Sequence, residues 1–151
     1  MGDENSFQDL IAELPNWNNG EGVGPDAWIE MMGSYELAVG YSLVFWPRFV
    51  VIDGYVLRAG ATADALRQWE QATGGDRRAI EASMNHFHIA DLHVNASKPN
   101  EAQLRYIGRV LQETHRAKLA ADFPERQFVV QFTDEPGLDY LDYELTFWQE
   151  G

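Results

Sequence analysis

YELAVGYSLVFWPRFVVIDGYVLR, residues 35–58, is the longest apolar run in the chain. It is rich in β-branched and aromatic residues, a composition typical of half-buried strands. Pro47 interrupts the run, and Asp53-Gly54 divides its second half. The pattern predicts two long strands joined near Pro47, with a bend or bulge at Gly54. The first strand is expected to place alternate residues from Tyr35 to Phe45 on one face.

Helical spacing appears on both sides of this run. The apolar residues of segment 1–14 recur at intervals of three and four, which predicts a short amphipathic helix. A loop, 16–25, follows. Four further helices are expected at 27–32 with Asp26 as its cap, 62–72 capped by Thr62, 76–92 capped by Asp76, and 101–121. Gly108 lies on the apolar stripe of the last helix, so a close contact is expected there.

The C-terminal quarter predicts a second pair of strands. Residues 127–133 alternate apolar and polar, and Pro136-Gly137 suits a type II turn. The last strand, 140–149, is expected to bury Leu141, Tyr143, Leu145 and Phe147. The chain therefore predicts an α+β fold, with an antiparallel sheet of about four strands packed against about three main helices. A single domain is expected over 1–151.

Composition restricts the compartment and the chemistry. The chain has no cysteine, so it has no disulfides, thiolate metal ligands or cysteine nucleophile. The acidic start, MGDENSFQDL, lacks the features of a signal peptide. Charges and a proline within 37–57 argue against a membrane span there. A cytoplasmic location and no membrane contact are expected.

The net charge is −13, and it is unevenly distributed. Eight acids and no base precede Arg48, and six acids and no base follow Arg126. All eleven Lys and Arg residues lie within the segment from Arg48 to Arg126, which also holds ten acids. Nucleic acid is excluded as a direct ligand because binding it needs a basic surface. A basic protein partner is the natural complement, and solubility alone is the alternative explanation of the acidity.

Three of the four histidines lie in NHFHIADLH, residues 85–93. On a continuous helix His86 and His93 would share one side, and His88 would approach Asp91. His115 lies on the apolar stripe of the next predicted helix. The spacing matches no metal motif, and neither a metal nor a cofactor is expected. His88, Asp91 and His115 are interpreted as a buried polar network, with a metal or acid–base site and simple exposure as the alternatives.

Carboxylates and aromatic residues at the two ends suggest a binding surface. The last strand would place Asp142, Glu144 and Trp148 on one face, next to acids in the preceding turn. Trp148 could serve as an aromatic anchor, or be covered by another segment. The expected partner-binding residues are Trp17, Glu21, Asp134, Glu135, Asp139, Asp142, Glu144 and Trp148. No catalytic residue is assigned, because no serine-hydrolase elbow or specific carboxylate pair occurs.

Several stretches resemble a family of small bacterial proteins of unknown function. They are WNNGEG (17–22), GYSLVFWPRFV (40–50), DGYVLR (53–58), NHFHIADLH (85–93), QLRYIGRVLQE (103–113) and LDYELTFWQ (141–149). This resemblance would span most of the chain and implies no catalytic residue. In size and acidity, though not in any motif, the chain also resembles immunity proteins, which neutralise a toxin domain by binding it.

The function expected from the sequence is non-catalytic binding of a basic protein partner, such as a toxin neutralised by its immunity protein. A small enzyme or metal-binding protein that uses residues 86–93 is the main alternative. A subunit of a homo-oligomer, paired through an exposed sheet edge, is the third.

Overall fold

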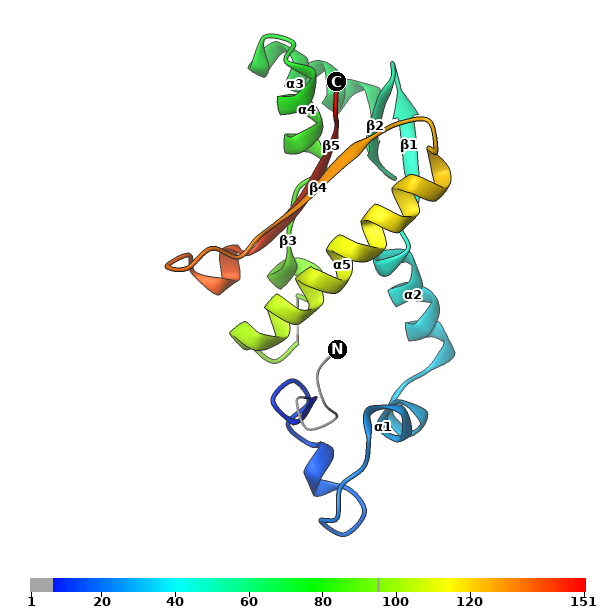
Figure 1. Ribbon diagram of the computed structural model, residues 1–151, viewed down its shortest axis with the longest axis vertical. Coiled ribbons are helices and arrows are strands. Elements are labelled where there is room, and N and C mark those ends of the chain that lie inside the picture. The colour runs from blue at the N-terminus through cyan, green and yellow to red at the C-terminus, as the bar shows by residue number, and fades with distance from the viewer. Residues whose placement is uncertain (1–6, 95) are drawn as a thin grey trace. The chain divides into compact units, whose positions relative to one another are not determined.

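The computed structural model describes residues 7–94 and 96–151. The chain divides into two compact units, Met1–Tyr41 and Ser42–Gly151. The described residues form an α+β fold with five α-helices and two small antiparallel sheets (Figure 1). The α+β class is therefore confirmed, while the single four-stranded sheet is wrong. The single domain over 1–151 stays a prediction.

Unit 1 contains short turns followed by helices. The amphipathic helix expected over 1–14 is not formed in residues 7–14, which make 3-10 and turn hydrogen bonds before the 3-10 helix η2, Leu14–Asn16. A helix this short is marginal in water. Residues 1–6 lie outside the described part. Helix α1, Pro25–Met32, is confirmed, but Gly24 is its N-cap and Asp26 lies in its first turn.

The largest error concerns residues 35–46. They form helix α2, Tyr35–Phe45, where a strand was expected. The Ser34 hydroxyl accepts a hydrogen bond from the Leu37 N–H at 3.1 Å, as a helix N-cap does. The helix ends before Pro47, which disfavours helical geometry at the residue preceding it. Cap and stop residues therefore prevail over the β propensity of the apolar residues between them.

In unit 2 a tight hairpin follows the end of α2. Strands β1, Phe49–Ile52, and β2, Tyr55–Arg58, pair antiparallel, with Ile52 opposite Tyr55. The two residues between them have positive φ, 51° at Asp53 and 82° at Gly54, as a type I′ turn requires. Asp53-Gly54 is therefore the hairpin turn, so the expected long strand that continues through a bend or bulge at Gly54 is wrong.

Helices α3, Ala63–Thr73, and α4, Arg77–Met84, follow the hairpin. Both predicted caps are confirmed, because the Thr62 side chain accepts from the Ala65 N–H and the Asp76 side chain from the Ala79 N–H. The second helix is shorter than the expected 76–92. After Met84 the chain forms strand β3, Phe87–His88, and the 3-10 helix η3, Ile89–Leu92.

The second sheet has the order β3-β5-β4. Strands β4, Phe128–Thr133, and β5, Glu144–Gln149, form its long pair, and the 3-10 helix η4, Tyr140–Asp142, precedes β5. Helix α5, Glu101–Asp122, runs along the β4–β5 pair (Figure 1). The predicted stripe of α5 is confirmed, since Leu104, Gly108, Leu111, His115 and Leu119 are buried.

The sheet has covered faces on both sides. Leu145 and Phe147 of β5 join the core cluster that includes α5. Thr146, on the alternate face, donates its hydroxyl to the Ala82 carbonyl of α4 at 2.5 Å. Because successive strand residues point to opposite faces, α5 and α4 cover opposite sides of β5.

Side chains of α4 bridge the two sheets. The buried Glu81 carboxylate accepts from the Val56 N–H of β2 at 2.8 Å and from the Gln149 N–H of β5 at 2.9 Å. One turn later, the Asn85 amide donates to the carbonyls of Val56 and Phe147. These contacts satisfy backbone groups that a continuous sheet would have paired. Among the described residues no helix is long and apolar enough to cross a membrane.

Candidate functional site

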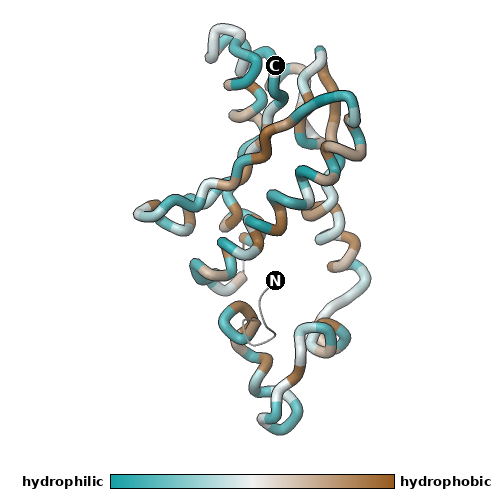
Figure 2. Tube along the Cα trace, in the orientation of Figure 1, coloured by the Kyte–Doolittle hydropathy of each residue, from teal (hydrophilic) through white to brown (hydrophobic). Residues whose placement is uncertain are grey.

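The connection between β4 and β5, residues 134–143, carries most of the predicted acidic site. The predicted type II turn is consistent with the structure, since Leu138 N–H donates to the Glu135 carbonyl at 3.1 Å and Gly137 has a φ of 90°. The Asp139 carboxylate then accepts from the Leu141 N–H at 2.9 Å. In Figure 2 the tube is brown where β4 and β5 overlap, beside α5, while the connection beyond them is mostly teal to white.

The first acid of this connection is neutralised within unit 2. The Asp134 carboxylate lies 3.1 Å from Nε of Arg105 and 3.4 Å from Nη2 of Arg109. Arg105 also pairs with Glu101 at 2.9 Å. The pKa of Glu101 is lowered mainly by a hydrogen bond from the Tyr143 hydroxyl, and to a smaller extent by the contact with Arg105. This group therefore fixes the base of the connection, and the charge of Asp134 is balanced within unit 2.

The remaining acids of the connection are exposed. Glu135, Asp139 and Asp142 have no base within ion-pair distance in the described part of the chain. Leu138 and Leu141 lie between them in the sequence and are also exposed, at 36% and 38%. Leu141 was expected in the core, but it belongs to η4 and not to β5. We name these five residues the acidic tip; apolar side chains among unpaired carboxylates suit protein recognition.

Trp148 does not belong to this tip. It is 8% exposed and lies under the Arg78 guanidinium of α4, 4.7 Å from its ring centroid. It is also near the opposite end of β5 from Glu144. The prediction of an exposed aromatic anchor is wrong because the sequence does not reveal that α4 covers the second face of β5.

Trp17 and Glu21 lie in unit 1. The Trp17 indole N–H donates to the Glu13 carboxylate at 3.2 Å, and the Asn18 amide to the Glu21 carboxylate at 3.4 Å. Both contacts are local and stabilise the loop that precedes α1. That these two residues extend the acidic surface of unit 2 stays a prediction.

Sequence reasoning missed a second candidate surface, which lies on α1 and the first half of α2. Its side chains are large and apolar, with exposed fractions of 58% at Ile29, 49% at Met31, 50% at Met32, 92% at Tyr35 and 54% at Leu37. Glu30 and Glu36 lie among them, and no base occurs before Arg48. We name these seven residues the α1–α2 surface. The α2 part of this surface was not predicted, because a strand over 35–46 would place alternate residues, including Tyr35 and Leu37, in the core.

The histidine stretch is not one buried network. Asp91 is exposed, with 79% of its side chain accessible, because α4 ends at Met84 and the helical register assumed for Asp91 does not exist. His88 Nδ1 lies 3.7 Å from an Asp91 oxygen, and His88 Nε2 lies 3.5 Å from a Glu144 oxygen. The interpretation of Asp91 as a buried carboxylate is therefore wrong. The described residues contain no group of three or more His, Asp or Glu side chains arranged to hold a metal ion.

His115 is the buried histidine, 1% exposed within the core around α5. Its Nδ1–H donates to the Leu111 carbonyl at 2.8 Å, because a carbonyl oxygen can only accept. Burial, with a smaller contribution from the charge of Arg58, lowers the pKa of His115 to about 4. His115 is therefore neutral at physiological pH and takes the place of an aromatic core residue.

The chain matches no protein-family model, no curated protein and no solved structure at a significant level. Function is therefore inferred from the side chains described above.

Proposed function

We propose that this protein binds a basic protein partner without catalysing a reaction. One observation carries the proposal: exposed apolar side chains occur among carboxylates that no base neutralises. The acidic tip shows this in unit 2, and the α1–α2 surface shows it in unit 1. Apolar groups supply the desolvated centre of an interface, and surrounding charges accelerate association and select the partner.

The charge distribution favours a basic partner over a second copy of the chain. Unit 1 holds eight acids and no base, and the acidic tip holds three acids without a paired base. A second copy would bring like charges together, which is unfavourable at an interface. A basic partner would gain from both surfaces. A toxin domain neutralised by a small acidic immunity protein is the partner class that this size and charge favour.

Charge reversal in three matched pairs tests the proposal and locates the surface. The variants are Glu135→Lys with Asp142→Lys at the tip, Glu30→Lys with Glu36→Lys on α1–α2, and Glu113→Lys with Glu125→Lys as a control from the balanced middle segment. Each pair changes the net charge equally. Each variant would be used to capture partners from an extract of the native host, followed by binding measurements with the purified partner.

We expect a basic protein to be captured by the wild type and the control. At least one of the other two variants should lose binding. Capture of the partner by all three variants as efficiently as by the wild type would show that binding does not use these surfaces. If the captured protein is a toxin, co-expression should rescue growth, and the variant that loses binding should fail to rescue.

A further inference from the structure

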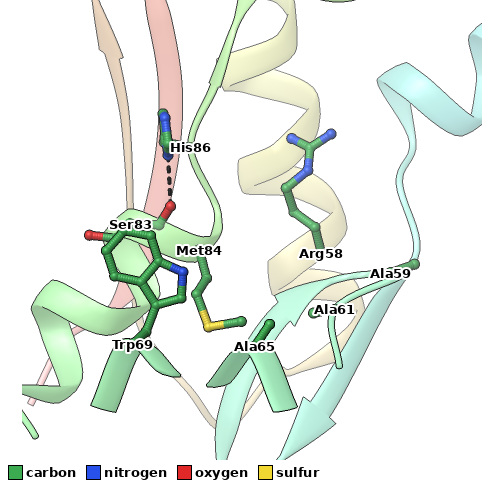
Figure 3. Close-up of a pocket in the computed structure, with 8 residues that line it drawn as sticks. All are labelled: Arg58, Ala59, Ala61, Ala65, Trp69, Ser83, Met84 and His86. Atoms are coloured by element: carbon green, nitrogen blue, oxygen red, sulfur yellow. Dashed lines mark hydrogen bonds between the residues drawn. The ribbon is translucent and has the colours of Figure 1, made fainter. Parts of the chain in front are cut away.

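Unit 2 has a cavity of about 350 Å³ beside the end of β2, between α3 and α4. Apolar groups, including the Trp69 indole, the Met84 side chain and Ala65, form much of its wall. Arg58 and His86 supply polar groups and lie on opposite sides of the space above Met84 (Figure 3). The His86 ring is oriented by its Nδ1–H, which donates to the Ser83 carbonyl at 2.7 Å.

The Arg58 side chain is a half-buried cation with no anion. Burial lowers its pKa, which means that the surroundings disfavour its charge. Its Nη1 is fully buried and has no hydrogen-bond partner, and no carboxylate of the described residues lies within ion-pair distance. The guanidinium stacks 4.0 Å from the Phe87 ring centroid, which holds it in place. A desolvated charge without a partner is costly, so its retention needs a reason.

His115 does not supply the missing negative charge. Its Nε2 is buried and also lacks a hydrogen-bond partner. The His115 ring is neutral, and the positive charge of Arg58 disfavours its protonation. The positive charge of Arg58 would remain uncompensated.

Arg77 provides an instructive contrast. Its guanidinium also stacks on an aromatic ring, 3.9 Å from the Tyr55 centroid. Arg77 is exposed to water and donates to the Asp53 carbonyl at 3.2 Å, so its charge carries little desolvation cost. An arginine can therefore stack on an aromatic ring while it stays exposed to water, so stacking does not explain why the Arg58 guanidinium is buried and unpaired.

We propose that this cavity binds a small organic carboxylate, with the carboxylate on Arg58 and an apolar body against Trp69 and Met84. A guanidinium recognises a carboxylate through paired, charge-assisted hydrogen bonds. Apolar walls with a few polar groups are typical of small-molecule sites. The site does not involve the acidic tip or the α1–α2 surface, so it stands independently of the proposed partner binding.

Phenylacetate and its neutral analogue phenylacetamide test the proposal by NMR titration of the full chain, following the Trp69 indole N–H and the His86 ring. Phenylacetate should shift both signals saturably. Phenylacetamide should bind at least about tenfold more weakly, because it cannot neutralise Arg58. Arg58→Met should weaken phenylacetate binding by a similar factor, whereas Arg77→Met should leave it unchanged.

Thermal unfolding without ligand separates a binding role from a structural one. Removing an unpaired, desolvated charge should leave the melting temperature of Arg58→Met equal to or above that of the wild type. Trp69→Ala, at a side chain 38% exposed, supplies a second variant that should fold and bind phenylacetate less tightly. The proposal is overturned if phenylacetate gives no saturable shift, if it binds Arg58→Met or Trp69→Ala as well as the wild type, or if inorganic phosphate binds more tightly.

Discussion

Two glycines in helix interiors show how differently the same residue can be used. A Cβ built on Gly108 would lie 2.2 Å from the Phe132 ring, so α5 approaches β4 closely because this residue has no side chain. A Cβ on Gly40 of α2 would meet no atom within 4 Å. Gly108 therefore has a packing role, whereas Gly40 lowers helix propensity without any packing benefit within the described residues.

Alanine substitution should separate these roles. Gly108→Ala should lower the free energy of unfolding by about 1–3 kcal/mol, because Phe132 must move within a packed core. Gly40→Ala should raise it by about 0.5–1 kcal/mol, because alanine favours the helix. Denaturant titration of the two variants measures both effects. A stable Gly108→Ala variant would show that α5 does not lie this close to β4.

His115 makes stability depend on pH. Its pKa in the folded protein, about 4, is below the usual 6.5, so between these values the unfolded chain binds more protons. The stabilisation that comes from burying neutral His115 is complete above the pKa that His115 has in the unfolded chain. It is lost as the pH falls toward the pKa of His115 in the folded protein. The loss should reach up to about 3 kcal/mol.

Comparing the wild type with His115→Phe isolates this effect, because the other titrating groups are common to both. The phenylalanine keeps an aromatic ring among Phe49, Phe87 and Phe147. Unfolding free energies should fall more steeply for the wild type than for the variant between about pH 6.5 and 4. Parallel curves would mean that His115 is accessible to protons in the folded state.

At the scale of elements, α4 holds the two sheets together through polar side chains. Asn85 is fully buried, and its amide joins β2 to β5. The side-chain oxygen of Asn85 also accepts a hydrogen bond from the backbone N–H of Arg58 at 3.0 Å. This arrangement explains why two small sheets replace the single sheet expected from the sequence.

Asn85→Ala should destabilise unit 2 by roughly 3 kcal/mol, because several buried backbone groups would lose their partners. Gln131→Ala, on the exposed side of β4, is the control and should change stability by no more than about 0.5 kcal/mol. Thermal or denaturant unfolding would report both. Similar small effects at the two positions would mean that the sheets do not depend on this bridge.

Local sequence patterns predicted several elements well. The caps Thr62 and Asp76 and the stripe of α5 are confirmed, because each depends on residues near one another in sequence. The close contact expected at Gly108 is also confirmed, although its partner Phe132 lies in another element. The split sheet and the burial of Trp148 were not predictable, because they depend on α4 covering β5 across more than sixty residues of sequence. Helix α2 was predicted as a strand because its β-branched and aromatic residues were given more weight than the N-cap signal of Ser34.

At the scale of the whole molecule, the charge asymmetry is the feature on which the proposed function depends most. Purely acidic ends flank a balanced middle, and exposed apolar side chains accompany the acids in both units. The sequence predicted the acidic character of the surface but placed its apolar centre at Trp148. The structure moves the candidate centres to Leu138 and Leu141 at the tip and to the apolar residues of α1–α2.

The association rate with the captured basic partner, measured as a function of salt, tests the proposed function most directly. Electrostatic steering predicts a steep fall in the association rate constant as ionic strength rises from about 0.01 to 0.15 M, with a much smaller change in dissociation. Reversing the charges at Glu135 and Asp142, or at Glu30 and Glu36, should reduce both the rate and its dependence on salt. An association rate that is insensitive to salt and to both reversals would contradict the account and leave solubility as the role of the acidic residues.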